Sequence, residues 1–168
     1  LWSARDALGL ALQIHVAETR YELNNILQET GLTPLRYLDA CGLVDSRLSA
    51  VHCVFLDDEE IQLLKERQVI PVYNPKSNMK LGSGIAPITK MLRAGIPVAL
   101  ANDGSASNDI LDMFEEMRCA ALLQKVAAED PSVISAADVF RMATENGALA
   151  ARIASRDDRW RIVAIQIG

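Results

Sequence analysis

Residues 48–64, LSAVHCVFLDDEEIQLL, carry the pattern that decides the fold of this chain. The apolar first half predicts a buried strand, and Asp57 followed by Glu60 is typical of the first turn of a helix. The same order of an apolar run, a polar turn and a helical segment begins at 10–14, 69–72 and 97–101. Buried strands that alternate with helices predict an α/β fold with a parallel sheet and right-handed crossovers.

Helix boundaries elsewhere can be predicted in the same way. Thr33 followed by Pro34 predicts a helix that begins at the proline, and Ser135 with Asp138 predicts a second start. After residue 110, the apolar side chains that share one helical face are Met113, Phe114, Met117 and Ala121. We therefore expect a long amphipathic helix that turns this face toward the core.

The length of the chain leaves two folds open. Four strand–helix units are about half of a (β/α)8 barrel, which typically needs roughly 250 residues. This chain has 168 residues, so it fits either a small open α/β domain or the back half of a barrel. Half of the residues are apolar, which is enough to bury a sizeable core in either case.

Composition excludes several classes of function. The formal net charge is −5, and there is no basic stripe to bind a nucleic acid. No apolar run is long enough to span a bilayer, and the first residues lack the charge pattern of a signal peptide. Cys41, Cys53 and Cys119 are interpreted as reduced core residues. We therefore expect a cytoplasmic protein without nucleic-acid or membrane partners.

Three ionisable side chains follow apolar runs in the same way. The two histidines of the sequence, His15 and His52, close the first and second runs, and Asp103 follows the fourth. Because the carboxyl ends of parallel strands meet at one mouth, we expect these side chains to lie close together. Each one alone is more typical of a core, surface or turn residue, but the repeated placement favours a site. Imidazole and carboxylate are zinc ligands, so the spacing is compatible with a metal-assisted hydrolase.

Two polar loops are expected beside this mouth. Residues 73–84, YNPKSNMKLGSG, follow the third apolar run, and residues 103–108, DGSASN, follow the fourth. Loops at the carboxyl ends of strands commonly form the walls of a substrate site. Neither loop matches a phosphate-binding pattern.

These loops, together with HVAET at 15–19 and VH at 51–52, resemble the amidohydrolase superfamily. The resemblance is to the branch of 5′-methylthioadenosine/S-adenosylhomocysteine deaminases and related chlorohydrolases. It implies a distorted (β/α)8 TIM barrel of the metal-dependent hydrolase type, of which this chain forms about strands five to eight with their helices. Residues 1–150 would be the C-terminal half of that barrel. Residues 151–168 would be an unassigned tail with the character of a return strand to a small β domain.

The resemblance also implies a site. His15 and Asp103 would hold one divalent metal, zinc or alternatively iron. The implied catalytic residues are Glu18, His52 and Asp103. Glu18 would hold the purine edge and move a proton, His52 would orient the metal-bound hydroxide, and Asp103 would deprotonate the attacking water. Ser107, from its position four residues after Asp103, would contact the substrate together with Glu18 and Asp103.

The implied function is hydrolytic deamination of an aminopurine nucleoside, with release of ammonia through a metal-activated hydroxide. Two alternatives stay open. One is a triazine- or pterin-type aminohydrolase or chlorohydrolase of the same superfamily, and the other is an inactive fragment of a barrel. The expected partner is a small amino-heterocycle. Because a half barrel exposes unpaired strand edges, association into a homo-oligomer is a further expectation.

Three departures from the family pattern bear on activity. The chain has no His-x-His pair, which family members carry on strand one, so His15 and Asp103 alone would leave zinc under-coordinated. Ala101 and Asn102 stand where the family has Gly-Thr, and the familiar ending is not recognisable beyond Ala148. We therefore expect the chain to need the other half of the barrel for activity.

Overall fold

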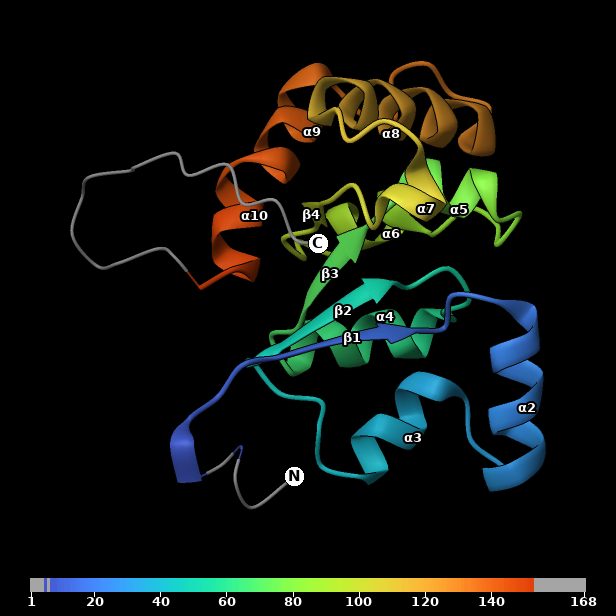
Figure 1. Ribbon diagram of the computed structural model, residues 1–168, viewed down its shortest axis with the longest axis vertical. Coiled ribbons are helices and arrows are strands. Elements are labelled where there is room, and N and C mark those ends of the chain that lie inside the picture. The colour runs from blue at the N-terminus through green and yellow to red at the C-terminus, as the bar shows by residue number, and fades with distance from the viewer. Residues whose placement is uncertain (1–4, 6, 153–168) are drawn as a thin grey trace.

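The computed structural model describes residue 5 and residues 7–152 (Figure 1). Within them the strands are β1 (Leu12–Val16), β2 (Leu48–His52), β3 (Ile70–Tyr73) and β4 (Ala99–Leu100). They form one sheet in the order β1-β2-β3-β4, and every neighbouring pair is parallel. A sheet order that follows the sequence order is the pattern of a (β/α)8 barrel, whereas a doubly wound sheet reverses its order.

Each connection between neighbouring strands contains at least one helix. The helices before β4 are α2 (Arg20–Thr30), α3 (Pro34–Ala40), α4 (Asp58–Glu66), α5 (Pro75–Lys80) and α6 (Ile88–Arg93). The helices after β4 are α7 (Ser105–Asn108), α8 (Met113–Ala128), α9 (Ala136–Ala143) and α10 (Glu145–Ala150). The prediction of one long loop over 73–84 is wrong in part, because the fixed φ of Pro75 starts a short helix there.

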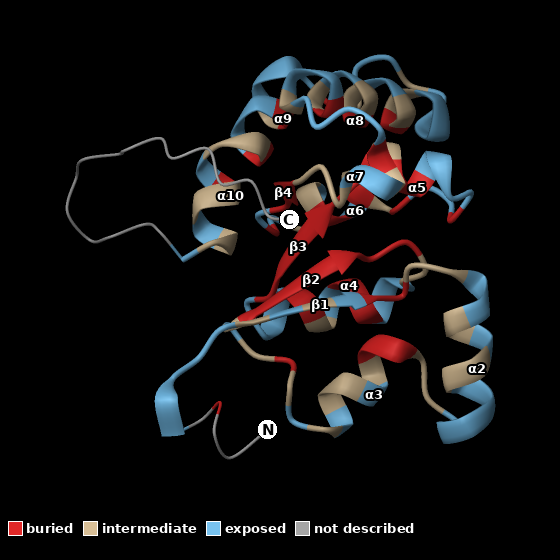
Figure 2. Cartoon of the chain, in the orientation of Figure 1, coloured by how far each residue is buried: buried red, intermediate tan, exposed pale blue. Residues whose placement is uncertain are grey.

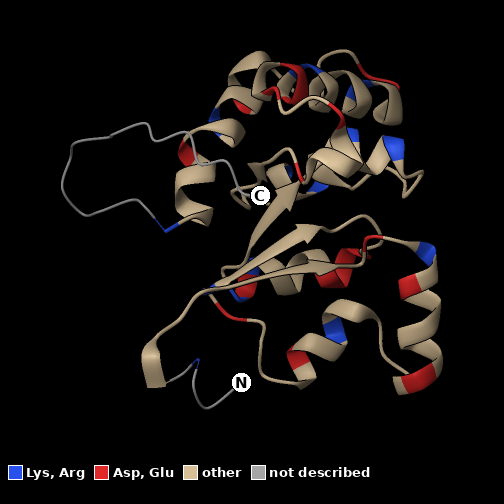
Figure 3. Ribbon diagram, in the orientation of Figure 1, with Lys and Arg blue, Asp and Glu red and all other residues tan. Residues whose placement is uncertain are grey.

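The strands bury side chains on both faces of the sheet. Leu48, Ala50 and Tyr73 belong to a large core shared with the helices, whereas Val51 and Val72 belong to a second, smaller cluster. Successive strand residues point to opposite faces, so the two clusters lie on the two sides of the sheet. Figure 2 shows β2 and β3 buried along their length, and Figure 3 shows charged residues on helices and loops. The charged groups of a site must therefore come from the strand ends and the loops beyond them.

β1 differs from the other strands. Exposure alternates along LQIHV and His15 is exposed, whereas β2, β3 and β4 are buried throughout. The prediction of buried, non-alternating strands is therefore wrong for β1 and confirmed for the others. The physical reason is that β1 pairs only with β2 within the described residues, so part of its surface meets solvent.

Two predicted helix starts are confirmed in detail. The Asp57 carboxylate accepts the Glu60 N–H at 2.8 Å, and the Glu60 carboxylate accepts the Asp57 N–H at 3.0 Å. Ser135 and Asp138 make the same reciprocal pair. α3 also begins where predicted, but the Thr33 hydroxyl donates to the Glu60 carboxylate instead of accepting a bond from its own helix.

The predicted apolar face of α8 is wrong at one position. Met113 and Met117 pack against the core, but Phe114 is 77% exposed. Glu116 and Gln124 are the buried side chains of this helix instead, together with an alanine. The reason is that α8 covers polar loops and not only strands, and buried polar groups need hydrogen-bond partners.

Residues 153–168 lie outside the described residues, and with them most of the predicted tail at 151–168. Cys41, Cys53 and Cys119 are free of disulfides as predicted, but only Cys53 is buried. In the part of the chain that the structure describes, no helix has the length and apolarity to cross a membrane.

Candidate active site

His15, Glu18 and His52 come together at the carboxyl ends of β1 and β2. One ligand atom from each lies within 4.8 Å of the other two. The two imidazole rings meet edge to face with their centroids 4.7 Å apart, and His52 Nε2 lies 3.8 Å from a Glu18 carboxylate oxygen. The parallel register places Val16 opposite His52, so the two strands end at the same level. The convergence predicted from the sequence is present for the two histidines, and Glu18 lies with them in place of Asp103, the third residue of that prediction.

The backbone at this corner adopts unusual conformations. Ala17, His52 and Cys53 have φ values of 53°, 71° and 51°, a region that residues with a side chain seldom occupy. The N–H groups of Val54 and Phe55 both donate to the Ala17 carbonyl, at 3.0 and 2.9 Å. The loop after β2 is thereby fastened to the end of β1. Strained backbone of this kind clusters at functional sites.

Glu22, in the first turn of α2, fixes the segment that carries Glu18. Its carboxylate accepts the N–H groups of Ala17 and Glu18, both at 2.8 Å. The Thr19 hydroxyl in turn accepts the Glu22 N–H at 3.0 Å. The sequence reasoning missed Glu22, although Thr19 three residues before it is the signal of a capped helix start.

Asn78 sets the tautomer of His52. The His52 side chain is buried, and its Nδ1 lies 2.8 Å from Asn78 Oδ1. Because an amide oxygen can only accept, Nδ1 carries the proton and Nε2 presents a lone pair. Nε2 is buried and has no hydrogen-bond partner among the described residues. Leaving such an atom unpaired is unfavourable, and a bound ligand would satisfy it.

The donor set at this corner fits a zinc ion. Zinc takes imidazole nitrogens and carboxylate oxygens, and a catalytic zinc site has about three protein ligands. His15, Glu18 and His52 offer two imidazoles and one carboxylate. A zinc ion held here by His15 would leave His52 Nε2, a buried atom without a hydrogen-bond partner among the described residues, free to accept a hydrogen bond from water. The structure thus places His15, a predicted metal ligand, beside Glu18 and His52, for which the resemblance implied catalytic roles.

Asp103 lies outside this three-residue set, on the loop after β4. Its Oδ2 accepts the hydroxyl groups of Ser77, at 2.6 Å, and Ser107, at 2.7 Å. Partial burial opposes ionisation, but the hydrogen bonds from these hydroxyls and from the Gly104 N–H outweigh it and hold the pKa of Asp103 below its usual value. The predicted substrate contact Ser107 therefore donates its proton within the protein, to Asp103 or, at 3.0 Å, to the Gly104 carbonyl.

The NPKSN segment supplies residues that the sequence reasoning described only as a substrate wall. Asn74, Ser77 and Asn78 are all buried. Ser77 and Asn78 bond to Asp103 and His52, as described above. With its amide oxygen turned toward Asp103, Asn74 accepts a hydrogen bond from the Asp103 N–H at 3.0 Å. Its amide nitrogen donates to the Val72 carbonyl of β3 at 3.1 Å. The clustering of short polar residues directly beyond a buried strand was the signal for this role.

A buried carboxyl group supports the Asp103 loop. Glu116 on α8 has no exposed surface, and its carboxylate accepts the Asn108 amide and, at 3.4 Å, the Lys76 N–H. The same Asn108 amide donates to the carbonyl of Asn102, the residue before Asp103. Burial raises the pKa of Glu116 to about 7 against the lowering effect of these hydrogen bonds. Nothing in the sequence reasoning singled out Glu116.

An open pocket of about 480 Å³ begins at the residue after Glu18. It is lined by Thr19, Arg20, Val54, Phe55 and residues 81–85. The Arg20 guanidinium lies 4.7 Å from the centroid of the Phe55 ring. The Ser83 hydroxyl is buried in the same wall and has no partner within the described part of the chain. There is room for a ligand directly beside the Glu18 corner.

Residues 2–156 match the amidohydrolase family. A 5′-deoxyadenosine deaminase of Methanothermobacter thermautotrophicus is 50% identical over 145 residues, which are 86% of this chain and 34% of that relative. A 5-methylthioadenosine/S-adenosylhomocysteine deaminase of Pelotomaculum thermopropionicum is 51% identical over 148 residues, which are 88% of this chain and 34% of the relative. The chain thus spans about a third of the length of the curated relatives it matches.

Two solved structures with bound zinc superpose on most of this chain. An adenosine deaminase from Xanthomonas campestris with bound zinc superposes with a TM-score of 0.86 at 42% identity, over 89% of this chain and 34% of that one. An atrazine chlorohydrolase from Arthrobacter aurescens, complexed with zinc, superposes with a TM-score of 0.83 at 30% identity, over 88% of this chain and 33% of that one.

Proposed function

The chain belongs to the amidohydrolase family, and on that premise we propose that it carries part of the active site of a zinc-dependent nucleoside deaminase. The reaction would be hydrolysis of the exocyclic C–N bond of an adenine nucleoside, with release of ammonia. The observation that carries the proposal is the corner of His15, Glu18 and His52, where a buried imidazole nitrogen has no hydrogen-bond partner among the described residues. Because the chain spans a third of its relatives, the proposal concerns the barrel to which these four strands contribute.

The substrate class is proposed from the relatives. Their names give 5′-deoxyadenosine, 5-methylthioadenosine and S-adenosylhomocysteine, which share an adenine ring and differ at the 5′ position. The adenine edge would lie against Glu18. The open pocket between Arg20, Phe55 and residues 81–85 would offer room to the part of the nucleoside that extends beyond this corner.

His15 and Asp103 would hold the metal, as the resemblance implies. When bound, zinc would act as a Lewis acid that makes water nucleophilic near neutral pH. The lowered pKa of Asp103 suits its proposed role as a ligand, because the carboxylate is ionised at neutral pH. As the proposed base, the same carboxylate would accept a proton from the attacking water. Ser77 and Ser107 hold that carboxylate in place.

Glu18 and His52 would act on the substrate side. The Glu18 carboxyl group would give a proton to a ring nitrogen so that negative charge does not build up on the purine. Its backbone is fixed for this purpose by Glu22. His52, with its proton held on Nδ1 by Asn78, would accept a hydrogen bond at Nε2 from the nucleophilic water and so orient it.

The substitution Glu18→Gln tests this proposal in the protein that carries this sequence. It should lower ammonia release from 5-methylthioadenosine by about 10²–10⁴-fold, because it removes the proton donor. Zinc content by elemental analysis should stay unchanged, since Glu18 is proposed as a proton carrier and not as a ligand. The control Glu29→Gln makes the same change on an exposed residue of α2 and should alter neither quantity.

Two results would overturn the proposal. Normal turnover by the Glu18→Gln variant would remove Glu18 from the mechanism. Release of chloride from a chlorotriazine, without ammonia release from any adenine nucleoside, would favour the chlorohydrolase alternative. The 30% identical atrazine chlorohydrolase is the reason to test it.

A further inference from the structure

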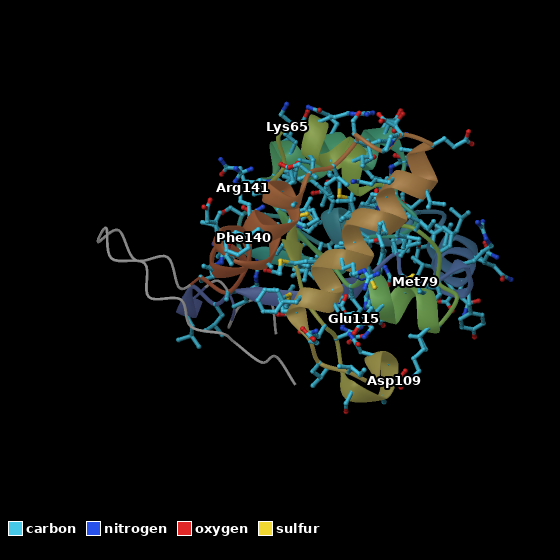
Figure 4. All side chains as sticks on the ribbon, turned by 90° about the horizontal axis from the view of Figure 1, so that it is seen from above. Lys65, Met79, Asp109, Glu115, Phe140 and Arg141 are labelled. Atoms are coloured by element: carbon cyan, nitrogen blue, oxygen red, sulfur yellow. The ribbon has the colours of Figure 1, made fainter. Side chains whose placement is uncertain are left out.

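Three helices that are separate in the sequence meet beside the Asp103 loop. α5 contacts both α7 and α8. Figure 4 labels one residue on or next to each of them: Met79 on α5, Asp109 at the end of α7 and Glu115 on α8. The junction encloses the side chain of Glu116, which the mechanism proposed above does not use.

The hydrogen bonds at this junction connect the two ends of the Asp103 loop. One amide nitrogen, Asn108 Nδ2, donates both to the Asn102 carbonyl and to the Glu116 carboxylate. Asn102 comes directly before Asp103, and Asn108 comes directly after Ser107. Because the Ser107 hydroxyl donates to Asp103, the Asn108 bridge closes the loop around the Asp103 carboxylate.

Within the part of the chain that the structure describes, Glu116 forms no ion pair with a cationic side chain. The Lys76 ammonium pairs with Glu115, at 3.8 Å, and donates to the Ile110 carbonyl, so its hydrogen bond to Glu116 comes from the backbone N–H and its charge acts on Glu116 from a distance. Burying a carboxyl group in this way is unfavourable compared with burying an apolar side chain of similar volume. Its presence is therefore better explained by what it holds in place than by stability.

We propose that Glu116 is a positioning residue for Asp103. By anchoring Asn108 against the Asn102 carbonyl, it fixes the Asp103 carboxylate in the orientation that binds the metal. The inference rests on the proposed function in one respect, namely that Asp103 is a metal ligand. Removal of a group bonded directly to a metal ligand typically changes metal affinity by about 10–100-fold. Glu116 acts on Asp103 through Asn108, so this range is the upper bound for its effect.

The test is the zinc dissociation constant of the protein that carries this sequence, measured by competition with a chromophoric chelator. Glu116→Ala should weaken zinc binding by up to about 10–100-fold. Glu116→Gln should recover most of that loss, because its amide oxygen can still accept the Asn108 amide. Asn108→Ala should weaken zinc binding as Glu116→Ala does, and it serves as the second variant if Glu116→Ala does not fold.

Gln124 provides a matched control on the same helix. It is also buried and polar, but it bonds to Tyr73, Ala86 and Thr89, away from the Asp103 loop. Gln124→Ala should lower the midpoint of thermal unfolding and leave the zinc dissociation constant unchanged. Equal weakening of zinc binding by Glu116→Ala and Gln124→Ala would overturn the proposal, because a general loss of stability would then explain both.

Asp103→Ala separates this inference from the proposed function. If Asp103→Ala abolishes zinc binding while the Glu116 and Asn108 variants bind zinc normally, the positioning role is wrong and the ligand assignment stands. If Asp103→Ala binds zinc normally, the ligand assignment is wrong and the positioning role falls with it.

Discussion

The two sides of the candidate site satisfy their polar groups to very different degrees. On the β1–β2 side, His15 is exposed and His52 Nε2 is buried with no partner among the described residues. On the β4 side, the Asp103 carboxylate accepts two hydroxyl groups and the Gly104 N–H. The β1–β2 side, here called the open side, therefore leaves a polar atom available to a ligand. The β4 side, here called the saturated side, holds the Asp103 carboxylate in one orientation and in its ionised form.

The largest expected effect comes from removing Asp103, the carboxylate on the β4 side of the site. Asp103→Ala should abolish both zinc binding and ammonia release, because it removes a proposed ligand that is also the proposed base. Elemental analysis and an ammonia assay on the same preparation check this. Asp109→Ala, which breaks an exposed ion pair with Lys80 next to the same loop, should retain both properties.

The next largest effect should come from removing Asn78, which fixes the tautomer of His52 on the open side. Asn78→Leu takes away the acceptor for His52 Nδ1, so the proton can move to Nε2 and block the lone pair there. Ammonia release should fall by about 10–100-fold, as is typical for the loss of an outer partner. Asn78→Asp restores an acceptor and should restore part of the rate. Unchanged turnover by Asn78→Leu would mean that the free lone pair of His52 has no role.

The free energy of unfolding should depend on pH because of Glu116, the buried carboxyl group that supports the Asp103 loop. Glu116 has a pKa near 4.5 when unfolded and about 7 when folded, so the folded state binds more protons between these values. The free energy of unfolding should therefore fall as the pH rises from about 4.5 to 7, by up to about 3 kcal/mol. Urea unfolding at several pH values should show this slope, and Glu116→Gln should flatten it. An unaltered slope in the variant would assign the effect to another group.

The smallest expected effect comes from removing one of two equivalent donors. Ser77→Ala leaves the Ser107 hydroxyl on Asp103, so the pKa of Asp103 should rise only part of the way to its usual value. The stability that ionised Asp103 contributes is present above its unfolded pKa and is lost as the pH falls. With both proteins metal-free, this contribution should be smaller in the variant than in the unaltered protein, and its loss should be complete at a higher pH. Acid unfolding followed by circular dichroism measures the shift, and a shift to lower pH would contradict the assigned hydrogen bond.

Much of the architecture could be predicted because it depends on local patterns. The run LSAVH places Leu48 and Ala50 on one face and Val51 on the other, which is typical of an inner strand of a covered sheet, and β2 is one. The reciprocal pair of Asp57 and Glu60 likewise follows from two residues at a fixed spacing. The parallel α/β sheet predicted from these runs is therefore confirmed, and so are the barrel type and the amidohydrolase family that the resemblance implied.

The same local reasoning failed where distant segments meet. The exposure of His15 depends on which strand lies beside β1, and the hydropathy of LQIHV does not contain that information. Phe114 was expected in the core because helical spacing alone cannot tell which face of α8 meets a polar loop. Asn78 and Glu116 were missed because their partners lie 26 and 40 residues away. Glu22 was missed although its spacing from Thr19 is a local signal.

The most direct test of the difference between the two sides is to locate the metal by anomalous diffraction at the zinc edge. The account predicts an ion within about 2.0–2.2 Å of a His15 nitrogen and an Asp103 oxygen, with the Glu18 carboxylate uncoordinated and facing the substrate space. An ion held by His15, Glu18 and His52, with Asp103 still bonded only to its two serines, would contradict it. The open side would then be the metal site, and the proposed proton transfer by Glu18 would have to be given up.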